Sequence, residues 1–429
     1  MSNQEQASTL RLLATGAGWL TAAQGAAQGA TFIASLVLAN VLGTARFGEY
    51  SFLQSSLNNF SLIAQLSFGI MATRFLAADA HRSPERGGQL LGLGSMMTVA
   101  NGLLIALALL AFAATRSAEQ SVFSIGLPLV AMACAIPFAA LGHFQVGVLQ
   151  GLRQFKSLAT LSFVQSVPAV AMPCIGALIG GVPGASLGLA LYVAGRCLTN
   201  EAVVRRLARS FGIEHSYRPA PGLTGTVLRF AIPASLTGVT AAGGQWLASL
   251  LLLHQENGPF QLGAYAIAMN FRVLALFVPN QLGGAALAMM SRHLADGNAS
   301  SYARVLGLNV IVTLSCAVAV ALALALAAPT LLVFFAADSE NTRTIVYIVL
   351  AAAVAEAFSI AVYQRLPSES RMWTSFFFVA LPRDSCFVAL SFALVGTHQA
   401  LGLATALAVS QVVAIAGVFV GSGSARKQG

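Results

Sequence analysis

Residues 303–328 read ARVLGLNVIVTLSCAVAVALALALAA and carry one charged side chain, Arg304, near their start. The 24 residues that follow Arg304 are all uncharged. Wound as an α-helix at about 1.5 Å per residue, they extend about 36 Å, which exceeds the roughly 30 Å of hydrocarbon in a bilayer. This stretch is therefore predicted to be a transmembrane helix.

The rest of the chain repeats this pattern. Of its 429 residues, 57% are hydrophobic and 9% are charged, against about a quarter charged in an ordinary soluble domain. This composition excludes a water-soluble protein and predicts an all-α, polytopic membrane protein of about 12 transmembrane helices. Hydropathy and turn residues place the helices at 13–41, 50–73, 88–114, 122–149, 157–180, 184–204, 225–253, 261–289, 303–328, 343–365, 372–396 and 398–421.

The longest polar connection separates these helices into two sets of six. It covers residues 205–224, is rich in Arg, and ends in Pro219, Pro221 and Gly222, residue types that interrupt helices. We expect two pseudo-symmetric six-helix lobes. Their predicted boundaries are 1–204 for the N-terminal lobe, 205–224 for a cytoplasmic linker and 225–429 for the C-terminal lobe.

The distribution of Lys and Arg predicts the orientation, because these residues favour cytoplasmic loops. If both termini are cytoplasmic, 18 of the 23 fall on the cytoplasmic side and three, Arg46, Arg116 and Arg343, on the outer side. The remaining two, Arg272 and Arg383, lie inside predicted helices. We therefore expect a multi-pass protein with both termini in the cytoplasm.

Several function classes are excluded by what the sequence lacks. The formal net charge is +9, yet the Arg residues are scattered among short loops and form no basic stripe, so no nucleic-acid partner is expected. The sequence contains no Walker-type phosphate loop and no HExxH motif. The five Cys lie in apolar runs without a nearby His. We expect no catalytic residue, no metal and no cofactor, and hence no enzyme.

An internal repeat occupies the same place in each half. The sequence FGEY at 47–50 opens the second predicted helix, and LGAY at 262–265 opens the eighth, 215 residues later. An Asn before an aromatic residue follows in each, and the segments end in RFLA at 74–77 and RHLA at 292–295. Two copies of the same orientation predict a pseudo-twofold axis along the membrane normal, with a cavity at the repeat interface.

The same segments carry a family resemblance. They are VLGTARFGEY at 41–50, QGLRQF at 150–155, LRFAIP at 228–233 and GAYAIAMNFR at 263–272. In this order and spacing, they resemble the polysaccharide flippases of the multidrug/oligosaccharidyl-lipid/polysaccharide exporter superfamily. The chain departs from many relatives in the seventh helix, where Gln245-Trp246-Leu247 stands in place of an acidic residue.

The resemblance implies a two-lobed bacterial inner-membrane protein. Such flippases move oligosaccharide repeat units, linked by pyrophosphate to a polyprenol, from the cytoplasmic to the outer leaflet. Membrane lipids are implied partners, together with the polysaccharide polymerase and glycosyltransferases of the same pathway.

Four charged side chains lie near the middle of predicted helices, where a charge is costly and generally faces a bundle interior or a wet cavity. They are Arg272, Glu356, Arg383 and Asp384. In one interpretation Glu356 pairs with Arg383 or Arg272 and holds helices together. In the other, Arg272 or Arg383 binds the substrate pyrophosphate, and Glu356 or Asp384 exchanges a coupling ion. Pro382 predicts a kink that frees backbone carbonyls beside Asp384.

The first half supplies amide side chains. Gln24 and Gln28 share one face of the first predicted helix, and Asn58 and Asn59 lie in the second. These amides either bond neighbouring helices together or line a cavity for a sugar, since an amide both donates and accepts hydrogen bonds.

These observations predict a flippase for lipid-linked oligosaccharide that works by alternating access. Two alternatives remain open at this point. A drug or cation antiporter of the same superfamily would prefer acidic and aromatic linings to Arg. A membrane-embedded polysaccharide polymerase or transferase would need larger outer loops than the sequence provides.

Overall fold

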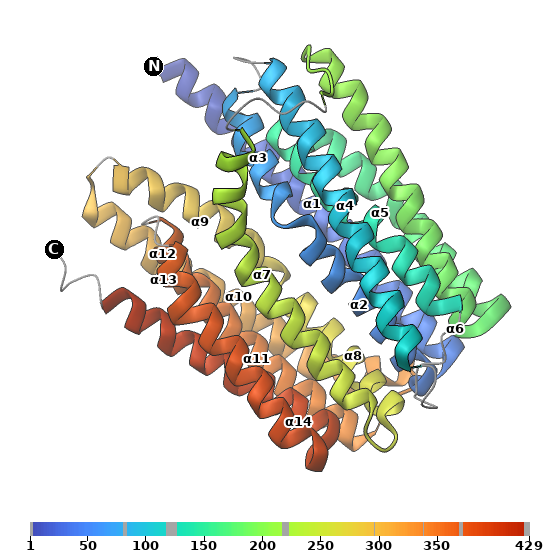
Figure 1. Ribbon diagram of the computed structural model, residues 1–429. Coiled ribbons are helices and arrows are strands. Elements are labelled where there is room, and N and C mark those ends of the chain that lie inside the picture. The colour runs from blue at the N-terminus through green and yellow to red at the C-terminus, as the bar shows by residue number, and fades with distance from the viewer. Residues whose placement is uncertain are drawn as a thin grey trace. The chain divides into compact units, whose positions relative to one another are not determined.

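The computed structural model describes residues 3–79, 84–116, 127–216, 223–295, 297–337, 339–368 and 372–423, and every regular element in these ranges is helical. The chain divides into two compact units (Figure 1). Unit 1 comprises Met1–Ala34 and Leu53–Ser235, and unit 2 comprises Ser35–Phe52 and Leu236–Gly429.

Three helices pass from one unit into the other, namely α1 (Asn3–Leu42), α2 (Thr44–Gln65) and α7 (Leu223–Leu253). The helices that lie wholly in unit 1 are α3 (Phe68–Asp79), α4 (Pro84–Arg116), α5 (Leu127–Gly151) and α6 (Phe155–Ser210). Those of unit 2 are α8 (Gly258–Ala275), α9 (Phe277–Ala295), α10 (Ala299–Phe334), α11 (Glu340–Tyr363), α12 (Arg365–Ser368), α13 (Met372–Ser375), the π-helix η2 (Phe376–Ala380) and α14 (Leu381–Gly423).

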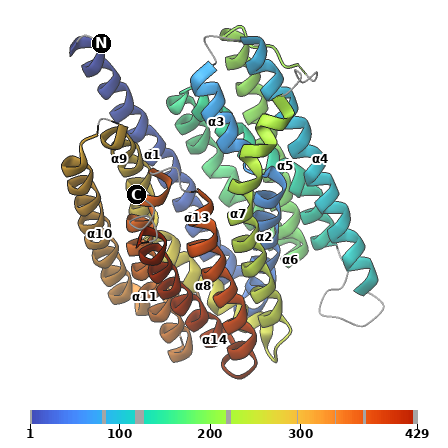
Figure 2. The ribbon, with the colours of Figure 1, turned by 60° about the vertical axis from the view of Figure 1, so that its left-hand side comes forward.

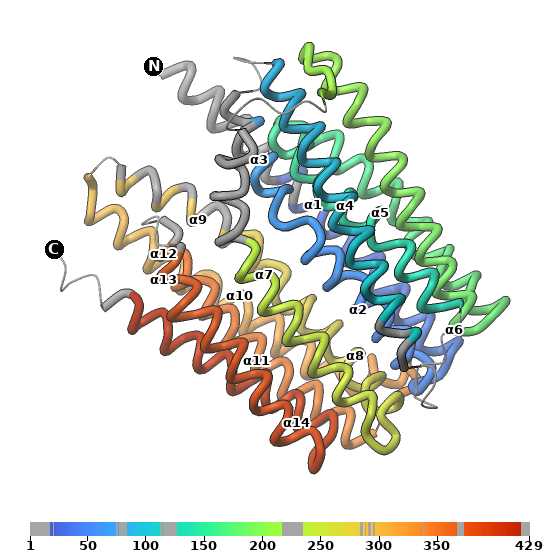
Figure 3. The backbone as a smooth tube through the Cα atoms, in the orientation of Figure 1, coloured from blue at the N-terminus to red at the C-terminus, as the bar shows by residue number. Residues whose placement is uncertain are grey.

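In unit 1, α5 packs against α3, α4 and α6. A buried apolar cluster that includes Phe68, Phe144 and Val148 holds these helices together. The α6 helix is a hairpin, because the backbone leaves helical geometry at Gly180 and Gly181, where Gly181 has φ 58° (Figure 3). Glycine allows this conformation at no steric cost, so α6 contains the two helices predicted at 157–180 and 184–204.

In unit 2, α11 is the central helix and packs against α8, α10 and α14 (Figure 2). The α14 helix also contains two predicted helices, separated at Gln399, which has φ 49°. The end of α1 joins this unit through the Asn40 amide, which donates to the Phe334 carbonyl at the end of α10.

Several boundaries differ from the predicted ones. The helix predicted at 50–73 is interrupted at Leu66 and Ser67, which adopt left-handed backbone conformations with φ 43° and 56°. The helix predicted at 261–289 is bent by 45° between α8 and α9. In the segment predicted as a linker, α6 continues to Ser210, and residues 217–222 lie outside the described ranges.

Eight described helices are long and apolar enough to cross a membrane, or nine if the bent α8/α9 pair is one span. Since α6 and α14 each contain two predicted helices, and α2 with α3 covers another, the described helices account for the 12 predicted ones. The predicted all-α fold of a polytopic membrane protein is confirmed.

Candidate functional site: buried ion pairs in unit 2

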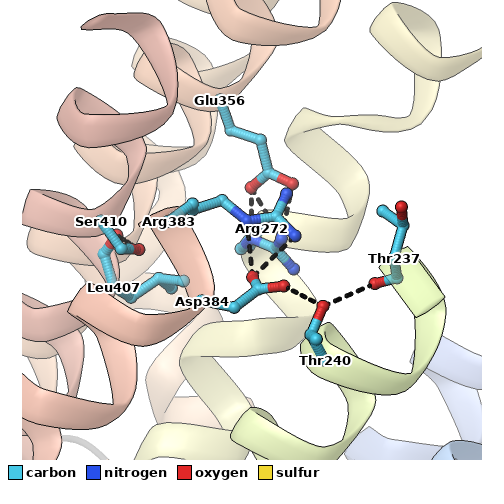
Figure 4. A network of polar contacts seen from close by, with 8 residues as sticks. All are labelled: Thr237, Thr240, Arg272, Glu356, Arg383, Asp384, Leu407 and Ser410. Atoms are coloured by element: carbon cyan, nitrogen blue, oxygen red, sulfur yellow. Dashed lines mark hydrogen bonds and ion pairs between the residues drawn. The ribbon is translucent and has the colours of Figure 1, made fainter. Parts of the chain in front are cut away.

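Arg272 of α8 and Glu356 of α11 form a bidentate ion pair (Figure 4). Arg272 Nε donates to Glu356 Oε2 at 2.8 Å, and Nη2 donates to Oε1 at 2.7 Å. The two side chains are only 18% and 16% exposed. Parallel hydrogen bonds of this kind are among the strongest that a guanidinium makes, so the pair fixes α8 to α11 and fixes the direction of the Arg272 side chain.

The Arg272 guanidinium has N–H donors that its pair with Glu356 does not use. The group has five N–H donors, and its bonds to Glu356 use Nε and Nη2. Among the residues that the structure describes, Nη1 has no hydrogen-bond acceptor. Arg272 therefore combines a fixed position with unused donors.

Tyr265 lies on α8 two turns before Arg272, a spacing that places both on one face of the helix. It is 4% exposed, and its hydroxyl has no hydrogen-bond partner within the described ranges. A buried hydroxyl without a partner is uncommon and calls for an explanation. It supplies a second unused polar group near Arg272.

The second ion pair joins neighbours in sequence. Arg383 Nε donates to Asp384 Oδ1 at 2.8 Å, and Thr240 Oγ1 of α7 donates to Asp384 Oδ2 at 2.7 Å (Figure 4). Both oxygens of the Asp384 carboxylate are thus engaged. The Thr240 hydroxyl thus links α7 to the Asp384 carboxylate of α14.

Pro382, two residues before Asp384, follows an irregular stretch of helix. Pro382 has no N–H to donate to the carbonyl of Phe378, four residues earlier, and the π-helix Phe376–Ala380 occupies this place. The Phe378 carbonyl lies against Gly417 of α14, since a Cβ added to Gly417 would be 2.0 Å from that oxygen. The backbone before Pro382 is thus irregular, and Gly417 lies against the Phe378 carbonyl; the predicted release of carbonyls beside Asp384 stays a prediction.

The predicted site residues divide between the two units. Arg272, Glu356, Arg383 and Asp384 belong to unit 2. Gln24 and Gln28 of α1 and Asn58 and Asn59 of α2 belong to unit 1. Gln24 and Asn58 are exposed, whereas Gln28 and Asn59 are half-buried. A cavity role for the four amides stays a prediction.

Unit 1 contains a polar cluster that was not predicted from the sequence. Gln145 of α5, which is 1% exposed, donates from Nε2 to Glu201 Oε2 of α6 at 2.9 Å. Glu201 Oε1 accepts from Arg205 Nε at 2.7 Å. The spacing of Cys197, Glu201 and Arg205, which places them on one helical face, could have indicated this cluster. In the sequence, Arg196 and Arg205 were interpreted only as charges that set the orientation.

The comparisons with known proteins agree with the fold. Residues 13–294 match the family model described as "Polysaccharide biosynthesis protein". The chain is 22% identical over 375 residues to "EPS I polysaccharide export inner membrane protein EpsE" of Ralstonia solanacearum, which covers 83% of this chain and 81% of that protein.

Solved structures show the same fold at low identity. An inward-facing multidrug resistance MATE family transporter of the MOP superfamily matches with a TM-score of 0.75 and 13% identity, over 94% of this chain and 96% of the other. A MOP superfamily transporter from Pyrococcus furiosus Vc1 matches with a TM-score of 0.72 and 13% identity, over 97% and 96% of the two chains.

These matches confirm the resemblance seen in the motifs at 41–50, 150–155, 228–233 and 263–272. The family model covers well over half of the chain, and the fold is that of the MOP superfamily transporters. The chain is a multi-pass membrane protein that belongs to the polysaccharide biosynthesis protein family.

Proposed function

We propose that this protein is a flippase that moves polyprenyl-pyrophosphate-linked oligosaccharide repeat units from the cytoplasmic to the outer leaflet for polysaccharide biosynthesis. Membership of the polysaccharide biosynthesis protein family supports the polysaccharide cargo, and the likeness to an export protein of the inner membrane points the same way. The shared fold of MOP superfamily transporters supports movement of the cargo across the membrane by alternating access.

The observation that carries the proposal is the state of Arg272. Glu356 holds two of its nitrogens, which leaves Nη1 without an acceptor among the described residues. Arg272 lies 14 residues into α8, about 21 Å along the helix axis. A permanent cation at such depth, with unused donors in a fixed direction, suits an incoming pyrophosphate. Arg383 is the second candidate for contact with the pyrophosphate.

The amides of unit 1 and the carboxylates of unit 2 have separate roles in this proposal. Gln24, Gln28, Asn58 and Asn59 would bind sugar hydroxyls, because each amide can both donate and accept. Glu356 and Asp384 remain the candidates for exchange of a coupling ion. Glu356 is bonded to Arg272, and Asp384 is bonded to Arg383 and Thr240. Exchange of an ion therefore requires these partners to move.

The remaining parts of the proposal concern the cell. Both termini lie in the cytoplasm of a bacterium, the lobes are 1–204 and 225–429, and the protein works beside the polymerase and glycosyltransferases that make and use its cargo. The protein moves the cargo without changing a covalent bond. Reporter fusions at either terminus test the orientation, and an outer location of either reporter contradicts it.

The leaflet distribution of the polyprenyl-linked oligosaccharide tests the function. It is measured in cells that lack this protein and any redundant flippase, and again after adding back the wild type, Arg272→Ala or Arg304→Ala. Arg304 is an exposed cation on α10 and serves as the matched control. We expect accumulation in the inner leaflet, relieved by the wild type and Arg304→Ala but not by Arg272→Ala. Normal export in the deletion strain contradicts the flippase function, and rescue by Arg272→Ala contradicts the anion site.

A further inference from the structure

Arg196 of α6 is a cation without a counter-ion. It is half-buried, and its guanidinium makes no hydrogen bond or ion pair with any residue that the structure describes. This sets it apart from Arg272 and Arg383 of unit 2, which both have carboxylate partners. A charge inside a transmembrane segment is rarely left unpaired.

The carboxylate nearest to Arg196 along α6 is already fully used. Glu201 accepts from Gln145 at Oε2 and from Arg205 at Oε1, at 2.9 and 2.7 Å. The charge of Arg205 balances that of Glu201, so the cluster as a whole keeps the positive charge of Arg196. No carboxylate among the described residues neutralises that charge.

Gly142 of α5 provides the space in which the Arg196 guanidinium lies. A Cβ added at Gly142 would be 3.2 Å from Arg196 Nη2, 3.7 Å from Nε and 3.9 Å from Cζ. The guanidinium therefore lies beside the Gly142 backbone, in space that a larger residue at position 142 would fill.

The position of Arg196 along α6 indicates which anion reaches it. The second arm of α6 begins after Gly181, and Arg196 follows 15 residues later, about 22 Å along the axis. Residues 182–195 carry no charge, whereas Glu201, Arg205, Arg206 and Arg209 follow Arg196. Arg196 therefore lies just inside one boundary of the hydrocarbon, from which a long cationic side chain reaches lipid phosphates.

We propose that Arg196, which lies beside Gly142, binds the phosphate group of a membrane lipid in the leaflet at the Ser210 end of α6. The ligand is a phosphate ester or pyrophosphate with an apolar chain, which places its phosphate at the depth of the guanidinium. Its source is either a resident phospholipid or the polyprenyl pyrophosphate carrier. The site lies in unit 1 and shares no residue with the Arg272 site; only the carrier as its ligand rests on the proposed function.

Native mass spectrometry of the purified full-length protein tests this site. The protein is titrated separately with phosphatidylglycerol, with undecaprenyl pyrophosphate and with diacylglycerol, which lacks a phosphate. Arg196→Gln should weaken binding of at least one phosphate lipid by about tenfold or more, the effect expected for loss of a charge-assisted hydrogen bond. Binding of diacylglycerol should not change. Arg304→Gln is the control for loss of one exposed cation.

A second variant keeps the charge and moves the guanidinium. Gly142→Val places a side chain where the Arg196 guanidinium now lies. It should weaken binding of the same lipid that Arg196→Gln affects. This variant also serves if Arg196→Gln fails to fold. If Arg196→Gln weakens the binding of phosphatidylglycerol, the ligand is a resident phospholipid. If it weakens the binding of undecaprenyl pyrophosphate alone, the ligand is the carrier. Unchanged binding of both phosphate lipids in a folded variant overturns the proposal.

Discussion

Gly48 of α2 and Gly263 of α8 lie against each other's helices, with backbone touching backbone. A Cβ added to Gly48 would be 1.9 Å from the Pro259 carbonyl oxygen and 2.7 Å from the Gly263 nitrogen. A Cβ added to Gly263 would be 2.1 Å from the Thr44 carbonyl oxygen. These glycines hold equivalent places in the internal repeat, in FGEY and LGAY, so the two copies of the motif meet at one helix crossing.

Replacing either glycine should separate the helices at this crossing. Gly48→Ala requires a shift of the Pro259 backbone, and overpacking of this kind costs about 1–3 kcal/mol. We expect a clearly lower melting temperature of the purified protein and reduced export. Gly307→Ala in α10 is the matched control, because nothing lies within 4 Å of its added Cβ. Equal melting temperatures for the two variants would contradict the close approach.

The fold was largely predictable because apolar runs and charge clusters determine where spans begin and end. Two breaks were missed, at Leu66–Ser67 and at Leu276, although Gly69 and Pro279 follow them within three residues. Residues 205–210 continue α6, because an Arg-rich sequence can also form a good helix, and the linker between the lobes stays a prediction. Polarity alone did not distinguish a continued helix from a loop.

The candidate site was predictable in its members and only partly in its pairing. Depth within apolar runs identified Arg272, Glu356, Arg383 and Asp384, which form two ion pairs. The Arg272–Glu356 pair was one of two alternatives for Glu356, since partners on different helices depend on helix packing, which a single sequence does not reveal. The Arg196 environment was missed for the same reason, as its definition requires Gly142 on another helix.

The Arg272–Glu356 pair allows stability and transport to be separated. Arg272→Gln or Glu356→Gln alone leaves one charge buried without a partner, which costs about 3–5 kcal/mol. The double variant removes both charges and should recover most of the melting temperature. If Arg272 binds the cargo, export stays lost in the double variant despite its restored stability. Recovery of both properties would show that the pair only holds helices together.

Arg383 should control whether Asp384 can take a cation from solution. In the wild type, Arg383 Nε and Thr240 Oγ1 occupy the two carboxylate oxygens. Arg383→Gln leaves Asp384 without its positive partner, so a bound cation becomes favourable. We expect the melting temperature of this variant to rise with the concentration of Na⁺, and that of the wild type to rise less.

The double variant Arg383→Gln/Asp384→Asn is the control for this effect. It lacks the carboxylate, so the response of its melting temperature to Na⁺ should return to that of the wild type. A response that persists in the double variant would place the cation elsewhere. If the melting temperatures of the wild type and Arg383→Gln respond equally to Na⁺, Arg383 does not prevent a cation from binding Asp384.

The segment after α6 should dock in a pH-dependent manner. Ile213 is fully buried, and Ser216 N–H donates to the Gly88 carbonyl of α4 at 3.1 Å. Burial lowers the pKa of His215, which lies between them outside the transmembrane helices, and Arg205 and Arg209 lower it further, while Glu201 acts in the opposite direction. The docked segment therefore favours neutral His215. Docking is at full strength above the ordinary histidine pKa of about 6.5 and weakens as pH falls below it.

Hydrogen–deuterium exchange of residues 211–216 measures this docking. After correction for the intrinsic exchange rate, exchange at the Ser216 amide should be faster at about pH 5 than at pH 7.5, because protonation of His215 favours release of the segment. His215→Gln cannot gain a proton and should remove most of the difference. An equal pH effect in the wild type and His215→Gln would assign it to another group, and slower exchange at low pH would contradict the direction of the pKa shift.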